Sequence, residues 1–129
     1  MDFATTLGTT LNVGRIAYGI AAVVSPTKAA KGWIGRAAKQ PSVHPMTRAF
    51  GIRDVALGAA TIGALKAAGP SGTGARMLLA LGVMVDATDA LSGFVSRHDV
   101  PKASTIYAVA GGAAVAGALA LAAAVSEDD

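Results

Sequence analysis

The chain contains no cysteine and little charge. Only 19 of its 129 residues are Lys, Arg, Asp or Glu, or 15%, where an average soluble domain has about 25%. The missing thiol excludes disulfides, thiolate catalysis, iron–sulfur clusters and cysteine-based zinc sites. A small soluble domain needs a charged shell, because it has much surface for its volume. The composition therefore excludes a soluble domain, and a mean hydropathy of +0.52 excludes a disordered chain.

Alanine and glycine take the place of the missing charge, with 30 and 16 residues. A helix that crosses a bilayer needs about 20 mostly apolar residues, and four windows meet this need. These windows are residues 3–24, 47–68, 76–96 and 103–125. The sequence therefore predicts one all-α domain over residues 1–129, an integral membrane bundle of four transmembrane helices.

Basic residues between the first two spans predict a short amphipathic helix over residues 26–39. At 100° per residue one face carries Lys28, Lys31, Arg36 and Lys39, and the other carries alanines and Trp33. Such a helix lies in the membrane interface, with the tryptophan at headgroup depth and lysines toward anionic lipid. A helix that binds a partner or nucleic acid is the alternative. Because a span adjoins it, we favour lipid headgroups as the contact and expect no nucleic-acid partner.

The loop charges predict the orientation of the chain in a cell membrane. The loops after the first and third spans hold seven Lys and Arg residues, and the opposite side holds two together with acidic ends. Cytoplasmic loops carry the excess of Lys and Arg. We therefore expect a multi-pass protein whose basic loops are cytoplasmic and whose two termini are outside.

Five ionisable residues lie inside the predicted spans. They are Arg15, Arg53, Asp54, Asp86 and Asp89. Each costs on the order of 2.5–3.5 kcal/mol at the bilayer centre. Counted at 1.5 Å per residue from the basic side, all five lie roughly 12–16 Å deep. Three helices thus bring five charges to one layer.

The depths predict specific pairs in this intramembrane charge cluster. Asp89 matches Arg53 and Asp86 matches Arg15, and Asp54 is left over or shares an arginine. Arg48 either reaches the interface or extends the cluster, as Asn12 also can. The cluster is interpreted in two ways: as a structural network that fixes helix packing, or as a polar cavity for a proton, an ion or a headgroup.

The segment from Arg48 to Gly58 is the most distinctive stretch of the chain. With Arg15 before it and Asp86-x-x-Asp89 after it, it gives the pattern R-x-x-G-x-R-D-x-x-x-G followed by D-x-x-D. This pattern resembles uncharacterised small bacterial four-helix membrane proteins, broadly the DoxX-like families. The resemblance covers about residues 12–95 and implies the architecture, without an established activity.

The remaining motifs point away from catalysis. No spacing of His, Asp or Glu matches a metal site, and no nucleophile motif is present, so we expect no metal, no cofactor and no enzyme. Small residues recur every fourth position in the second and fourth spans, which allows close helix packing within the chain or between subunits. The sequence thus favours a non-enzymatic accessory or self-associating subunit of a membrane assembly. The alternative is a small oligomeric transporter or channel that uses the charge cluster.

Overall fold

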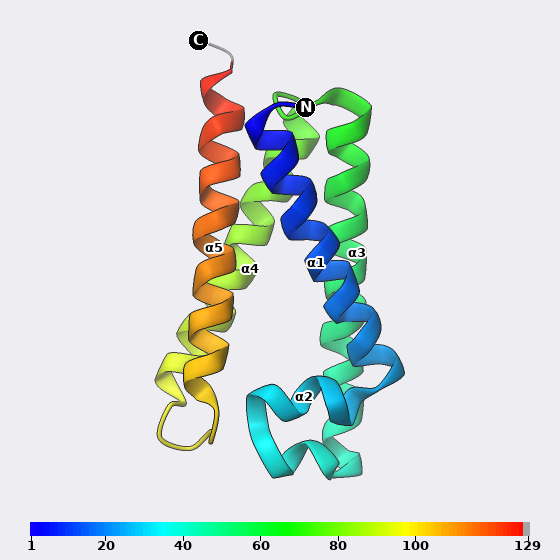
Figure 1. Cartoon of the computed structure of the whole chain (residues 1–129), viewed down its shortest axis with the longest axis vertical. Coiled ribbons are helices and arrows are strands. Elements are labelled where there is room, and N and C mark those ends of the chain that lie inside the picture. The colour runs from blue at the N-terminus through cyan, green and yellow to red at the C-terminus, as the bar shows by residue number, and fades with distance from the viewer. Residues whose placement is uncertain (128–129) are drawn as a thin grey trace.

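The computed structural model describes residues 1–127 and contains five α-helices (Figure 1). They are α1 (Phe3–Val24), α2 (Pro26–Ile34), α3 (His44–Ala68), α4 (Thr73–Val95) and α5 (Ala103–Ser126). Two 3₁₀ turns, Gly35–Lys39 and Pro41–Val43, join α2 to α3. No strand occurs among the described residues. Asp128 and Asp129, part of the acidic C-terminal end, lie outside them.

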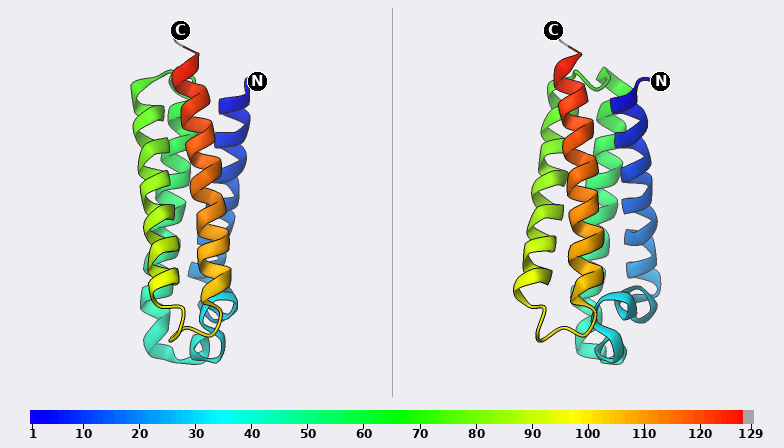
Figure 2. Two further views of the ribbon diagram at one scale, coloured as in Figure 1. Left: turned by 90° about the vertical axis from the view of Figure 1, so that its left-hand side faces the viewer. Right: turned by 60° about the vertical axis from the view of Figure 1, so that its left-hand side comes forward.

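The four long helices form an up-and-down bundle made of two closely packed pairs. Helix α1 packs along α3, and α4 packs along α5, with fewer contacts between the two pairs. Both termini lie at one end of the bundle, and α2 lies at the other end (Figures 1 and 2). The two ends of the bundle therefore differ, since one holds the termini and the other holds the basic connections.

Three of the long helices are apolar enough to cross a membrane. They are α1, α4 and α5. Helix α3 is long enough, with 25 residues. It carries Arg48, Arg53, Asp54 and Lys66, however, and is too polar to be counted with the other three. Large aliphatic side chains such as Ile52, Val115 and Leu119 are exposed on the outside, as a lipid environment favours. The structure thus indicates a small helical membrane protein, while the predicted count of four spans rests on α3.

Glycines bring the helices of each pair into close contact. A Cβ atom added to Gly51 of α3 would lie 2.6 Å from the carbonyl oxygen of Gly19 on α1. On the other pair, a Cβ added to Gly93 would lie 2.7 Å from a side-chain carbon of Ile106. Small residues allow helix backbones to approach in this way, and both contacts lie toward the end that holds α2.

The connection between α1 and α3 differs from the sequence prediction. The predicted interfacial helix over 26–39 is α-helical only to Ile34, because Gly35 adopts φ 61° and the chain continues as a 3₁₀ turn. A positive φ suits glycine, which has no Cβ. Helix α3 begins at His44, before the predicted start, because Pro45 occupies its first turn, where a proline nitrogen needs no hydrogen-bond partner.

Asp2 caps the N-terminus of α1 outside the apolar stretch. Its side chain accepts hydrogen bonds from the backbone N–H of Thr5 at 2.6 Å and from the Thr5 hydroxyl at 2.8 Å. These bonds favour the charged carboxylate and lower the pKa of Asp2. The capping interaction is therefore complete at neutral pH and is lost as the pH falls through that lowered pKa.

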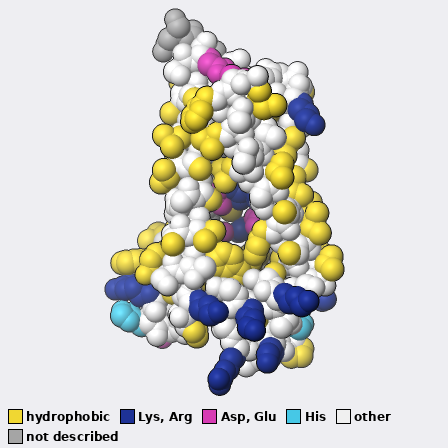
Figure 3. Space-filling view, viewed as in Figure 1, with side chains coloured by type: hydrophobic (Ala, Val, Ile, Leu, Met, Phe, Trp, Pro, Cys, Tyr) yellow, Lys and Arg dark blue, Asp and Glu magenta, His cyan; other side chains and the backbone are white. Residues whose placement is uncertain are grey.

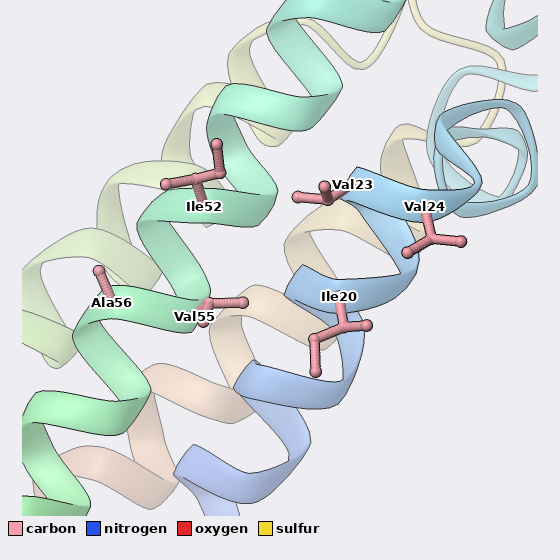
Figure 4. A pocket seen from close by; sticks show the side chains of 6 residues that line it. All are labelled: Ile20, Val23, Val24, Ile52, Val55 and Ala56. Atoms are coloured by element: carbon pink, nitrogen blue, oxygen red, sulfur yellow. The ribbon is translucent and has the colours of Figure 1, made fainter.

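A shallow hollow of about 320 Å³ lies between α1 and α3. Figure 4 shows the six aliphatic side chains around it, from Ile20, Val23, Val24, Ile52, Val55 and Ala56. It offers no side-chain hydrogen-bonding group, so it resembles the lipid-facing surface of a membrane bundle and has no means of orienting a polar ligand.

Candidate functional site: a charged cavity between two helix pairs

Two ion pairs connect the α1–α3 pair to α4. Arg15 Nη2 of α1 lies 2.5 Å from Asp86 Oδ2, and Arg53 Nη2 of α3 lies 2.8 Å from Asp89 Oδ2. These are the pairs predicted from depth along the helices. Asp86 and Asp89 share a face of α4 because residues three apart are neighbours on a helix surface. One face of α4 thus receives an arginine from each of the other two helices.

Asp54 lies between the two arginines. Its Oδ1 atom is 3.3 Å from Arg53 Nη2 and 3.7 Å from Arg15 Nη1. The five side chains therefore form one continuous series, Asp86–Arg15–Asp54–Arg53–Asp89. Three carboxylates and two guanidinium groups give the cluster a formal charge of −1.

The two ends of the series differ in burial. The side chains of Arg15 and Asp86 are 6% and 10% exposed, whereas those of Arg53 and Asp89 are 35% and 38% exposed. An ion pair withdrawn from solvent is costly to break, while one that stays accessible contributes little. The Arg15–Asp86 pair is therefore the structural end of the cluster, and the Arg53–Asp89 pair is its accessible end.

Gly82 lies beside the Arg15 guanidinium. It is one turn before Asp86 on α4, and a Cβ added there would be 3.5 Å from Arg15 Nη2, an ordinary van der Waals contact. The Nε atom of Arg15 is buried and has no hydrogen-bond partner, so the described residues leave one donor of this arginine unsatisfied.

The cluster lines a cavity of about 780 Å³ between the two helix pairs. In Figure 3 the cavity is visible as a hollow on one side of the molecule, with charged side chains of both signs inside it and lysines and arginines gathered below. Apart from the five charged residues, apolar side chains dominate the wall, with a few hydroxyl groups. The α5 side is formed by Ile106, Val109, Ala110 and Ala113. The cavity is therefore apolar on its walls and charged at one level.

Aromatic side chains complete the wall near α2. Trp33 Nε1 donates a hydrogen bond to the Tyr18 hydroxyl oxygen, and the two rings meet edge to face with centroids 5.5 Å apart. The Cζ atom of Arg53 lies over the Phe50 ring, 5.2 Å from the ring centroid. The structure thus places Trp33 at the cavity, whereas the sequence grouped it with the lipid-headgroup residues.

The other predicted contact residues lie outside the cluster. Lys28, Lys31, Arg36 and Lys39 are exposed, at the end of the bundle that holds α2. Arg48 Nε donates to the carbonyl oxygen of Val23 at 3.2 Å. Asn12 is buried and donates to the carbonyl oxygen of Gly8 at 2.8 Å. Neither Arg48 nor Asn12 hydrogen-bonds to the five charged residues, so the expected extension of the cluster is not found.

Sequence reasoning missed Tyr18 and Gly82 as parts of the site. Tyr18 lies three residues after Arg15, and Gly82 lies four residues before Asp86. Residues three or four apart share a helix face, so the helical spacing from the charged residues was the signal that could have found both. Among residues 1–127, no group of three His, Asp or Glu side chains is arranged to hold a metal ion.

Comparison with known proteins gives a family and no relative of known activity. Neither the curated proteins nor the solved structures include a match to this chain. A family model described as a domain of unknown function, DUF4267, matches residues 12–125, which contain every member of the charge cluster. The broader resemblance to DoxX-like families stays a prediction. The chain belongs to the DUF4267 family.

Proposed function

We propose that this protein is a non-enzymatic membrane protein that binds an amphiphile, with the polar end of the ligand at the intramembrane charge cluster. In this proposal α3 crosses the bilayer together with α1, α4 and α5, the basic connections face the cytoplasm, and both termini face outside. The observation that carries the proposal is the cavity of about 780 Å³ that the cluster lines. A purely structural network of charges needs no such space.

The dimensions and the lining of the cavity support an amphiphile. Sites for small molecules have volumes of roughly 300–1,000 Å³, mostly apolar walls and a few polar groups that fix orientation. Here apolar residues of α1, α3 and α5 surround one charged level, and the outer pair Arg53–Asp89 is over a third exposed. The hollow opens on the side of the bundle (Figure 3), which in a bilayer is the direction from which a lipid-soluble molecule arrives.

A structural role in an assembly is the second candidate. The ion pairs hold α4 against α1 and α3, and the exposed aliphatic side chains Val115 and Leu119 of α5 offer a face to another subunit or a second copy. In this candidate the outer pair only fixes the packing of α3 on α4. A transport role for a proton or an ion would extend the binding proposal and would require an oligomer, because four helices are few for a complete path.

The sole tryptophan of the chain provides the test, because Trp33 lines the cavity. Purified full-length protein in nanodiscs is titrated with twelve-carbon amphiphiles that are brominated close to their ammonium, hydroxyl or carboxylate heads, and Trp33 fluorescence is recorded. Bromine quenches the indole only at close range. Binding at the cavity predicts a saturable component for at least one probe, above the gradual quenching caused by probe dissolved in the bilayer.

Two glycine variants locate the binding. Gly14 lines the cavity, and a Cβ added there meets nothing within 4 Å, so the side chain of Gly14→Leu begins in open space at the cavity wall. Gly63 on α3 is also open around its Cβ and does not line the cavity. We expect saturable quenching to persist in Gly63→Leu and to disappear in Gly14→Leu. Equal quenching in the two variants, or no saturable component with any probe, would overturn the proposal.

The double variant Arg53→Leu with Asp89→Leu separates the two candidates. A pair that serves packing alone should tolerate this double apolar change better than the single Asp89→Asn change, which leaves the Arg53 guanidinium without its nearer carboxylate. If the double variant folds and its saturable quenching by every probe is weakened, the outer pair takes part in binding. If folding and quenching both match the wild type, the cavity binds the probe without help from the outer pair, and the proposal that the head lies at this pair is wrong.

A further inference from the structure

We propose that the ligand of this cavity is an amphiphile with a positively charged ammonium head. This inference rests on the proposed binding function and names the class of ligand. It follows from the charge of the cluster, from the distribution of accessible groups around the cavity, and from the position of the opening.

The cavity carries one carboxylate more than its arginines can neutralise. Among its lining residues the charged side chains are Arg15, Arg53, Asp54, Asp86 and Asp89, and no lysine or histidine lines it. Arg15 neutralises Asp86 and Arg53 neutralises Asp89, while Asp54 shares both arginines at longer distances. Like charges in a low dielectric disfavour one another, so the site favours a ligand that brings one positive charge.

The accessible end of the cluster matches such a head. Asp89 has the most exposed of the three carboxylates, at 38%, and it accepts hydrogen bonds only from Arg53 among the described residues. A carboxylate has about four lone-pair positions, so Asp89 retains acceptor capacity toward the cavity. An ammonium group there would lie beside the aromatic wall formed by Tyr18 and Trp33, and aromatic faces attract cations.

The surroundings of the site favour an amphiphile over a hydrated inorganic cation. The walls above and below the charged level are largely apolar, and the volume of about 780 Å³ is far larger than one ion needs. The hollow opens sideways between α1 and α5 (Figure 3), toward acyl chains in a bilayer. A molecule with an apolar tail gains from burial along these walls, whereas a small ion would have to leave its water for a mostly apolar space.

The same brominated probes test the class of the head. We expect the ammonium probe to quench Trp33 with an apparent affinity at least about fivefold higher than those of the alcohol and the carboxylate, because a unit charge at partly buried distances is worth more than thermal energy. Sodium chloride up to physiological concentration should weaken ammonium binding only modestly, since partly buried charges are little screened. Displacement of the probe by millimolar sodium would instead assign the site to an inorganic cation and overturn the proposal.

Two substitutions change the charge of the cluster in opposite directions. Asp89→Asn makes the formal charge zero, and Arg53→Gln makes it −2. We expect the preference for ammonium over alcohol to fall at least about fivefold in the first variant and to rise in the second. Glu127→Gln, at the C-terminal end of α5, removes the same charge far from the cavity and is the matched control, with no change expected.

The outcomes separate this inference from the proposed function. Saturable quenching by the alcohol or the carboxylate, lost in Gly14→Leu but with no preference for ammonium, would leave the cavity as a binding site and overturn the ammonium class. A preference that fails to follow the charge in Asp89→Asn and Arg53→Gln would also overturn it. No saturable quenching by any of the three probes would overturn the proposed function itself.

Discussion

Asp86 and Asp89 permit a direct comparison of a buried and an accessible ion pair on one helix. Both are aspartates of α4, three residues apart, and each pairs with one arginine. Replacement by asparagine keeps the shape of the side chain and removes its charge. In Asp86→Asn the Arg15 guanidinium, with a side chain only 6% exposed, keeps a single carboxylate at 3.7 Å. In Asp89→Asn the Arg53 guanidinium is 35% exposed and keeps Asp54 at 3.3 Å.

These geometries predict different losses of stability. Removing one member of a buried ion pair costs on the order of 3–5 kcal/mol, because the other charge stays buried without compensation. With Asp54 still near Arg15, we expect about 3 kcal/mol for Asp86→Asn. An accessible pair contributes about 1 kcal/mol or less, which is the expectation for Asp89→Asn.

Denaturant titration in mixed micelles, followed by circular dichroism, measures both losses in the free energy of unfolding. The double variant Arg15→Leu with Asp86→Leu should recover part of the larger loss, because it removes the unmatched charge. Equal losses for Asp86→Asn and Asp89→Asn, or a larger loss for Asp89→Asn, would refute the division of the cluster into a buried and an accessible end.

Three further predictions concern packing, the aromatic wall and orientation. Gly51→Ala should destabilise the bundle by about 1–3 kcal/mol, because its Cβ would lie 2.6 Å from the Gly19 carbonyl oxygen. Gly63→Ala in the same helix is the control. Equal changes of the melting temperature in the two variants would contradict the close approach of α1 and α3. Tyr18→Phe removes the acceptor of the Trp33 hydrogen bond. We therefore expect a shift in the emission maximum of Trp33 and a decrease of about 1 kcal/mol in the free energy of unfolding. An unchanged spectrum would show that the bond is absent in the membrane. A reporter fused to the C-terminus should be active only in an external compartment, and cytoplasmic activity would reverse the proposed orientation.

Much of this architecture could be predicted from the sequence, from the length of the apolar windows and from the depth of the charged residues along them. Mostly apolar windows marked the long helices, and counting residues from the basic side placed Arg15 with Asp86 and Arg53 with Asp89. Counting of this kind works because a helix rises by a fixed 1.5 Å per residue and because a charge inside a membrane must find a partner at its own level.

The sequence left a polar cavity as one of two interpretations of the charge cluster, because the size of a cavity depends on how far the helix pairs diverge. Close contacts at Gly19–Gly51 and at Gly93–Ile106 join α1 to α3 and α4 to α5. No pattern in the sequence predicts the distance between these two helix pairs. The place of Trp33 at the cavity wall could not be predicted from the sequence for a related reason. Its helical face was compatible with lipid headgroups, but the fold places Tyr18 of α1 within hydrogen-bonding distance.

The open, negatively charged cavity is the central claim, and cysteine accessibility in nanodiscs tests it most directly. The chain has no native cysteine, so a single Ser92→Cys substitution introduces one thiol at the cavity wall. Val115→Cys, on the outer face of α5 and 61% exposed in the valine form, is the lipid-facing control. We predict that a cationic methanethiosulfonate reagent modifies Cys introduced at position 92 at least about fivefold faster than an anionic reagent of similar size, and that neither reagent modifies the control. Equal rates for the two reagents, or a position 92 thiol as unreactive as the control, would contradict the claim.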